Sequence, residues 1–330
     1  MGLKRKARLG IAAIGVLIII ASLLTWDYFR GPKRWIKKLK DPDVRTRRQA
    51  VQKLREMGAS AKEAIPALIE ALKDDDEESF VQSGAAHALG AIGIESLPRL
   101  IPLLKSDDDK MRYLAAVAIG KIGEEAIPEL RIALKDQSTE VRNGALEALR
   151  FMYTDGKKAI PDLIAATNDK EFEVRLAAFR ALASVGPASL PYISESLRDV
   201  NPERRVMAAI GMRRSWSPNQ QEAIPVLRAV LEDRNYWVRY HSALALVRCD
   251  EDAIETVEVL IEALQKDVND EEAAEALWKI RKSGTDMKKA IPVLLVAYKN
   301  GKSLVRDYAS DAILAIDQEA AIRAGIPLRD

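Results

Sequence analysis

Residues 115–130, AAVAIGKIGEEAIPEL, contain the end of one amphipathic helix, a glycine turn and the proline-marked start of another helix. Variants of the Ala-Ile-Pro corner in this stretch recur at intervals of 30–34 residues, with one interval of 67 that amounts to two periods. The prolines of these corners are Pro66, Pro98, Pro128, Pro161, Pro191, Pro225 and Pro292. A period of this length in a chain of 330 residues predicts a stack of helical repeats.

Each period reads as two helices joined by an acidic turn. The first helix follows Ile-Pro-x-Leu-x-x-Ala-Leu, where proline is tolerated because N–H groups of a first turn have no intrahelical partner. The second helix follows Val-Arg-x-x-Ala-x-x-Ala-Leu, and a single pair cannot bury its apolar stripe. We therefore expect an all-α fold, an α-solenoid superhelix of about nine helix pairs over residues 32–317, with residues 318–330 as a C-terminal cap or tail.

Glycine stands at the end of several second helices. Because glycine has no Cβ, it adopts positive φ angles without steric cost and often ends helices in the left-handed conformation. Caps of this kind are expected at Gly58, Gly93, Gly123 and Gly186.

The N-terminal segment differs from the repeats. A basic tail, residues 1–8, precedes 17 uncharged residues, Leu9–Thr25, which would form a helix about 26 Å long. Aromatic residues extend this run towards the roughly 30 Å of a bilayer core, so residues 9–29 are predicted to be a transmembrane anchor or an uncleaved signal. A cleaved signal peptide and a peripheral helix are the alternatives.

The orientation of this segment is not fixed by charge, because both of its flanks are basic and the positive-inside rule acts in both directions. The segment is built like a signal sequence. We therefore expect a single-pass membrane protein with its repeats on the extracytoplasmic side. Lipid contacts are expected through residues 9–40.

Charge is distributed unevenly along the chain. Residues 1–48 carry 13 lysines and arginines and 3 aspartates, a net of +10, whereas the remainder carries 38 basic and 46 acidic residues, a net of −8. Nucleic-acid binding requires a basic footprint, so the acidic repeats argue against it. The single cysteine, Cys249, excludes an intramolecular disulfide.

The repeat resembles a known family. Its pattern, Leu-x-Asp-x-x-x-x-Val-Arg-x-x-Ala-Ala-x-Ala-Leu-Gly-x-Ile-Gly, is similar to HEAT repeats, in particular to the short HEAT-like repeats named after phycobilin (PBS) lyases. Residues 85–93, AAHALGAIG, match its second half. The resemblance covers about residues 32–317 and implies the fold. It does not imply one function, because unrelated proteins use this repeat.

In such repeats the turn aspartate and the helix arginine often pair, which gives a ladder along the stack. The resemblance implies four pairs with partners six residues apart: Asp136 and Arg142, Asp169 and Arg175, Asp199 and Arg205, and Asp233 and Arg239. Gln82 and Asp270 stand where arginine is expected, so the ladder should break there. This structural role is favoured over an arginine-lined ligand groove, because each arginine has a carboxylate at a fixed spacing.

The sequence shows no pattern of catalytic or metal-binding residues. The two histidines, His87 and His241, are far apart, and neither is followed by glutamate. Iron-dependent deoxyhypusine hydroxylases, which are HEAT-like enzymes, use repeated His-Glu pairs that this chain lacks. The sequence also lacks Walker, dinucleotide-binding and nucleophile-elbow motifs. We therefore expect no cofactor, no metal and no catalytic residues.

One local patch combines arginine with aromatic residues. Trp237 occupies the slot of Glu140 and Glu173, which should face solvent. Exposed aromatic residues beside arginine are typical of interface hot spots. The candidate partner contacts are Arg213, Arg214, Trp216, Trp237, Tyr240 and His241. The alternative is that these large side chains fill a wider seam between repeats.

These features predict a membrane-anchored protein–protein interaction scaffold without catalytic activity of its own. Its protein or peptide partner is expected on the concave face of the solenoid, which the second helices line. An alternative is a lyase-like or accessory factor that handles a chromophore or cofactor. Nucleic-acid binding is a third hypothesis, which the acidic repeats disfavour.

Overall fold

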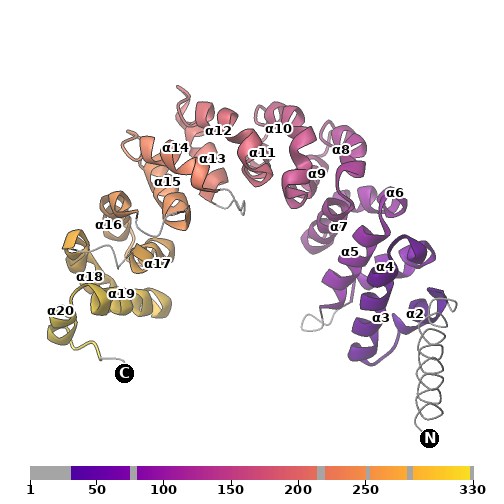
Figure 1. Cartoon of the computed structure of the whole chain (residues 1–330), viewed down its shortest axis with the longest axis horizontal. Helices are drawn as coiled ribbons and strands as arrows, with labels where there is room; N and C mark the ends of the chain where they lie inside the picture. The colour runs from indigo at the N-terminus through magenta and orange to yellow at the C-terminus, as the bar shows by residue number, and fades with distance from the viewer. Residues whose placement is uncertain (1–30, 75–79, 214–219, 250–252, 281–284, 328–330) are drawn as a thin grey trace, which may run out of the picture. The chain divides into compact units, whose positions relative to one another are not determined.

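The computed structural model of the chain describes residues 31–74, 80–213, 220–249, 253–280 and 285–327, and all regular secondary structure in these residues is helical (Figure 1). The chain divides into two compact units, Met1–Ala133 (unit 1) and Leu134–Asp330 (unit 2). In chain order, the described residues form nine pairs of helices between Lys33 and Ile316, which confirms the number expected from the sequence period.

Unit 1 holds the first helix pairs. Its second helices pack on one another, α3 on α5 and α5 on α7, and the first helices α2, α4 and α6 pack on the second helices α3, α5 and α7 that follow them. The elements are α2 (Lys33–Lys38), α3 (Val44–Met57), α4 (Ile65–Ala71), α5 (Val81–Ile92), α6 (Leu97–Leu100) with its 3-10 continuation η4 (Ile101–Lys105), α7 (Asp109–Ile122) and α8 (Ile127–Ala133).

Unit 2 continues the same arrangement. Its second helices, the odd-numbered α9 to α19, pack successively on one another, and its first helices, the even-numbered α10 to α18, lie in a separate row (Figure 1). The elements are α9 (Thr139–Phe151), α10 (Ile160–Ala166), α11 (Phe172–Val185), α12 (Leu190–Ser196), α13 (Pro202–Arg213), α14 (Ile224–Ala229), α15 (Tyr236–Cys249), α16 (Val257–Lys266), α17 (Glu271–Lys279), α18 (Ile291–Asn300), α19 (Ser303–Ile316) and α20 (Gln318–Arg323).

The Ile-Pro corner begins each first helix in the predicted way. In the stretch quoted above, the 3-10 turn η5 (Glu124–Ala126) leads into α8, and Pro128 lies in the first turn of that helix. The missing N–H of proline removes no helical hydrogen bond at this position. Ile127 and Leu130 of the same helix are buried, so the apolar stripe of the first helix faces the interior.

The glycine caps have positive φ angles but not the left-handed helical conformation that the sequence suggested. Gly93, Gly123 and Gly186 have φ of 90°, 82° and 90° and ψ of −150°, −151° and −149°. This region of the backbone map is open essentially to glycine alone. The chain thus leaves these helices in an extended direction and enters the next 3-10 turn at the following residue.

The predicted single-pass membrane location is contradicted. Within the described residues no helix combines the length and the apolar character needed to cross a membrane. The α-helices there reach at most 14 residues, or about 21 Å, whereas a bilayer core is roughly 30 Å thick. The segment predicted as the anchor, residues 9–29, lies outside the described residues.

We predict that Leu130→Ala lowers the free energy of unfolding by about 2–5 kcal/mol, because the substitution removes a fully buried side chain and leaves a cavity. Ile132→Ala, on the same helix, changes a side chain that is 74% exposed and should cost less than about 0.5 kcal/mol. Urea denaturation followed by circular dichroism measures both effects. Equal losses for the two variants would show that the burial pattern of this helix is wrong.

Candidate functional site

An arginine near the start of the second helix joins consecutive turns of unit 2. Arg142 on α9 donates through Nη1 to the main-chain oxygens of Asp136 and Gln137, both at 2.9 Å. Its Nε and Nη2 atoms donate to the carboxylate of Asp169, in the next repeat, at 2.8 and 3.0 Å. The side chain of Arg142 is 6% exposed and that of Asp169 is 14% exposed, so this two-point contact is shielded from water.

The aspartate in this contact also closes its own turn. Asp169 Oδ1 accepts the main-chain N–H of Glu171 at 2.9 Å. Burial alone would raise the pKa of Asp169, but the hydrogen bonds from Arg142 and from the Glu171 N–H outweigh burial and lower the pKa below its usual value. The carboxylate is therefore ionised at neutral pH and holds its own turn and the preceding arginine together.

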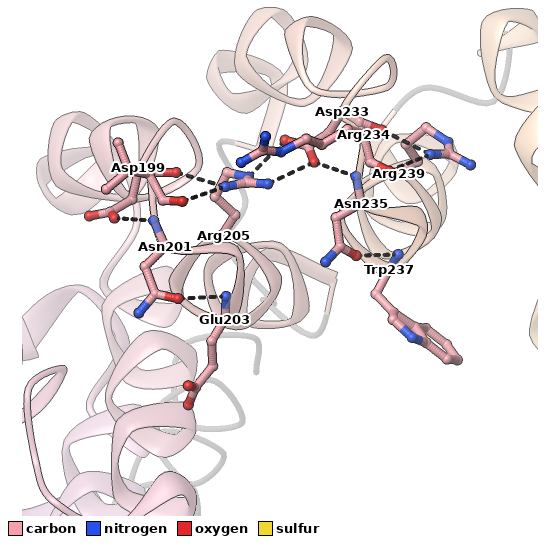
Figure 2. Close-up of polar contacts among 10 residues, drawn as sticks. Asp199, Asn201, Glu203, Arg205, Asp233, Arg234, Asn235, Trp237 and Arg239 are labelled. Carbon is pink, nitrogen blue, oxygen red and sulfur yellow. Dashed lines mark hydrogen bonds and ion pairs between the residues drawn. The ribbon is translucent and has the colours of Figure 1, made fainter.

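Arg205 on α13 repeats this geometry (Figure 2). Its Nη1 donates to the main-chain oxygen of Asp199 at 2.9 Å, and its Nε and Nη2 donate to the carboxylate of Asp233 at 2.8 and 3.2 Å. In unit 1, Arg47 contacts Asp74 in the same two-point manner, at 2.6 and 3.2 Å. The contact is thus a recurring feature of the repeat.

The other two arginines of the predicted ladder keep the main-chain contact, but each binds a glutamate in place of the aspartate of the next turn. Arg175 and Arg239 each donate to the main-chain oxygen of the aspartate six residues earlier, at 2.9 Å. The carboxylate partner of Arg175 is Glu203, and that of Arg239 is Glu262, at 2.8 Å.

The observed contacts therefore differ from the expected ladder in their connectivity. Each arginine reaches its own turn through main-chain oxygens, and its carboxylate contact lies 23–28 residues further along the chain. Asp270, which stands where the repeat pattern has arginine, is the N-cap of α17 and accepts the Ala273 N–H at 2.9 Å. Gln82, the other expected break, lies in the first turn of α5.

The turns before α13 and α15 orient the second residue of each of these two helices. Asp233 accepts the N–H of Asn235 at 2.8 Å, and the Asn235 side chain accepts the N–H of Trp237 at 2.9 Å. The side chain of Asn201 accepts the N–H of Glu203 in the same way, at 2.9 Å. Figure 2 shows Glu203 and Trp237 leaving the neighbouring helices α13 and α15 on the same side. Trp237 thus occupies the position of a glutamate in the preceding repeat.

Trp237 belongs to an aromatic cluster on α15. Its ring centroid lies 5.1 Å from that of Tyr236, 5.9 Å from that of Tyr240 and 5.9 Å from that of His241. The indole and the imidazole are stacked at an angle of 22°. Tyr240 and His241 are buried, whereas Trp237 is 54% exposed. The predicted patch is therefore an exposed indole supported by two buried rings.

Arg213 connects this cluster to the neighbouring helices. Its Nη1 atom lies 3.2 Å from His241 Nδ1 and 2.7 Å from Glu272 Oε2. The hydroxyl of Tyr240 donates to Asp270 Oδ1 at 3.0 Å. Side chains from α13, α15 and α17 thus meet at one site in unit 2. The two remaining candidate contacts, Arg214 and Trp216, lie outside the described residues.

The two buried rings keep a fixed protonation state near neutral pH. Burial, helped by the charge of Arg213, lowers the pKa of His241 to about 4, so the imidazole is neutral and Nδ1 accepts from Arg213. Burial, the charge of Asp270 and the hydrogen bond to it raise the pKa of Tyr240 well above its usual value. Neither buried ring therefore exchanges a proton near pH 7.

A small pocket lies beside Arg213, between α15 and α17. Its apolar lining comes from Leu244, Val247 and Ala276, and its charged lining comes from Arg213, Arg248, Glu272, Glu275 and Lys279. The volume is about 50 Å³. Small-molecule sites usually measure roughly 300–1,000 Å³, so this pocket has room for part of a side chain and not for a cofactor.

The other groups considered for chemistry are dispersed. His87 lies on α5, where its Nδ1 is 2.7 Å from the main-chain oxygen of Ser83. Cys249 is half-buried at the end of α15. In the part of the chain that the structure describes, no group of three or more His, Cys, Asp or Glu residues is placed to hold a metal ion.

Comparisons with known proteins agree with the repeat architecture. The sequence model described as HEAT repeats matches residues 32–109, 97–183, 127–213 and 190–278. A comparison with curated proteins finds no match.

Three of the solved structures that are similar to this chain are the following. YibA of Escherichia coli is 18% identical, with 81% of this chain and 95% of that chain covered and a TM-score of 0.39. Importin beta is 14% identical, with 86% and 46% covered and a TM-score of 0.45. Kap121p is 13% identical, with 90% and 34% covered and a TM-score of 0.47. This chain spans less than half of the latter two, and similarity at this level carries no information on function.

We predict that Arg205→Gln lowers the free energy of unfolding by about 3 kcal/mol, because the change leaves the mostly buried Asp233 carboxylate without its charged partner. Arg198→Gln removes an exposed arginine from the preceding turn and should change stability by less than about 0.5 kcal/mol. Guanidinium denaturation of both variants gives the comparison. If the two variants unfold alike, the contact between the turns does not stabilise the stack.

The lowered pKa of His241 predicts a specific dependence of stability on pH. Its folded-state pKa is about 4 and the unfolded value is about 6.5, so the unfolded chain binds a proton first as the pH falls. The contribution of His241 to stability is therefore constant above about pH 6.5 and is lost between there and about pH 4.

His241→Leu, which introduces the residue found at the equivalent Leu114, removes this proton linkage. Between pH 7 and 4.5 the wild-type chain should lose about 2 kcal/mol more stability than the variant. Urea denaturation of both proteins at the two pH values measures the difference between their losses of stability. Carboxylates present in both proteins contribute equally to both losses and therefore cancel in that difference. Identical losses would contradict a neutral, buried imidazole.

Proposed function

Because this chain belongs to the HEAT-repeat family, whose model matches residues 32–278 through four overlapping segments, we propose that it is a protein-interaction scaffold. The proposed partner is a protein or peptide, and the proposed contact surface is the second-helix face of unit 2 around Trp237. The observation that carries this proposal is the half-exposed indole of Trp237, which stacks on the buried ring of His241.

An exposed tryptophan at this position is not required by the fold. The equivalent residues of earlier second helices in unit 2 are Glu140, Glu173 and Glu203, which are exposed carboxylates. Replacing a solvated glutamate by tryptophan leaves apolar surface in water, and such residues concentrate in interface hot spots. Arg213, at the edge of the same cluster, is the other residue type enriched in hot spots.

We further propose that the chain acts by binding alone. The buried His241 has a pKa too low for proton transfer near pH 7, and the adjacent pocket of about 50 Å³ has no room for a cofactor. The alternative, a chromophore-handling role, has one observation in its favour: a cavity of about 330 Å³ in unit 1, which is large enough for a small ligand and is lined by Ile94, Leu97, Pro98, Ile101, Pro102 and Glu129. The net charge of −8 on residues 49–330 disfavours nucleic acid as the partner.

The proposal is tested by affinity purification of the full chain from the cells that naturally produce it. Wild type, Trp237→Ala and Val296→Ala are compared, because Val296 is a similarly exposed apolar residue on the first helix α18. At least one protein should co-purify with wild type and with Val296→Ala and be reduced about tenfold or more with Trp237→Ala, in line with the effect of a hot-spot truncation.

Two outcomes would overturn the proposal. One is a set of co-purifying proteins that does not respond to Trp237→Ala. The other is the absence of any co-purifying protein together with turnover of a substrate by the pure chain. Circular dichroism of each variant shows whether it is folded, so that loss of a partner is not confused with loss of the fold.

A further inference from the structure

A groove in unit 1 is lined by residues of two successive first helices, α6 and α8. Its volume is about 330 Å³, which falls within the usual range of small-molecule sites. One wall comes from α8 and consists of Glu129. The other wall comes from the 3-10 turn η3 (Ile94–Ser96), α6 and η4, and it consists of Ile94, Leu97, Pro98, Ile101 and Pro102.

Two prolines one helical turn apart distinguish this wall from those of other repeats. Pro102 has no N–H to donate to the carbonyl of Pro98, four residues earlier, so α-helical hydrogen bonding stops there. The α-helix α6 ends at Leu100 after 4 residues and continues as the 3-10 helix η4, whereas the equivalent α8 has 7 residues. The two prolines therefore add apolar rings to the groove and no main-chain donor.

The apolar character of the groove is not required by the fold. The residues equivalent to Ile94 and Ile101 in the next repeat are Glu124 and Arg131. Ile94 is 41% exposed, so the chain leaves apolar surface in water at a position where the repeat accepts a charged residue. Clustered apolar surface of this kind is typical of ligand-binding grooves.

Glu129 is the only charged residue in this lining among the described residues, and it is exposed. The residues three and four positions away are Glu125, Ala126, Ile132 and Ala133, so no cation neighbours it along the helix. No described residue forms an ion pair or a hydrogen bond with its side chain. An ionised carboxylate accepts hydrogen bonds and does not donate them. The side chains of the groove thus offer negative charge and acceptor atoms, without a donor.

We propose that this groove binds a small organic amine, whose apolar body packs on the isoleucine and proline side chains and whose ammonium group binds Glu129. An ammonium group supplies the positive charge and the donors that a carboxylate takes up. A carboxylate-bearing chromophore would find neither a cation nor a donor among these side chains. This inference goes beyond the proposed function and is independent of it, because Trp237 lies in unit 2.

The test is a titration of the full chain, labelled with 13C in the δ1 methyl groups of isoleucine, with n-hexylamine at pH 7, where an aliphatic amine is protonated. The signals of Ile94 and Ile101, assigned from Ile94→Val and Ile101→Val, should shift in a saturable way with a dissociation constant on the order of millimolar. Ile322 on α20, which is also exposed, reports non-specific contact, and its signal should not saturate.

Two molecules of the same chain length separate charge from apolar contact. n-Hexanol has no charge and should bind about two- to fivefold more weakly than n-hexylamine, because it lacks the ion pair with Glu129. Hexanoate carries the opposite charge and should bind more weakly than n-hexanol. Ionic strength is held constant throughout, because salt screens these contacts.

Three variants locate the site. Glu129→Gln should weaken n-hexylamine binding about two- to fivefold and leave n-hexanol binding unchanged. Glu195→Gln makes the same chemical change at an exposed position of α12 in unit 2 and should change neither. Ile101→Arg introduces the residue of the equivalent Arg131, places a cation in the groove and should abolish n-hexylamine binding. Circular dichroism shows whether each variant is folded.

The inference would be overturned by any of three results: no saturable shift of the Ile94 and Ile101 signals, binding of n-hexanol or hexanoate as tight as that of n-hexylamine, or equal effects of the two glutamate variants. A protein that co-purifies with wild type and not with Ile101→Arg, in the absence of amine binding, would identify the groove as a protein-docking surface and would also overturn it. None of these results bears on the role of Trp237.

Discussion

The guanidinium of Arg205 links two consecutive turns of unit 2, and the position of the candidate site depends on that contact. The side chain satisfies a main-chain oxygen of its own turn and both carboxylate oxygens of Asp233 in the next turn. Asp233 in turn accepts the N–H of Asn235, whose side chain caps α15 through the N–H of Trp237. A buried two-point ion pair with further hydrogen bonds is geometrically strict. The arginine therefore sets where the exposed indole stands relative to the preceding helix.

Stacking explains both the fold and the surface that it leaves for function. A pair of short amphipathic helices cannot bury its apolar stripe alone, so each second helix lies against the next one in its unit. The second residues of these helices are among those left outside this packing; they are glutamates in α9, α11, α13 and α17, tryptophan in α15 and leucine in α19. Because the rings beneath it are buried and uncharged near pH 7, the Trp237 indole is held in place without being covered.

The sequence predicted the features that repeat within one helix pair. The Ile-Pro starts, the burial of Leu130 and the outward position of Trp237 follow from periodicity and from comparing equivalent slots, and the structure shows each of them. It did not predict which carboxylate each arginine binds, because Arg142 reaches Asp169 only through the packing of neighbouring repeats. The burial of Tyr240 and His241 was missed for the same reason. The membrane location was inferred from an apolar run with aromatic and basic flanks, and no described helix is long and apolar enough to support it.

The most direct measurement is hydroxyl-radical footprinting of the full chain, alone and in the complex purified from its native cells. The account predicts that oxidation of Trp237 falls several-fold in the complex, while exposed residues of first helices, such as Ile132 and Val296, are oxidised equally in both samples. Equal oxidation of Trp237 in the two samples, with protection elsewhere on the chain, would contradict the claim that this face of unit 2 binds the partner.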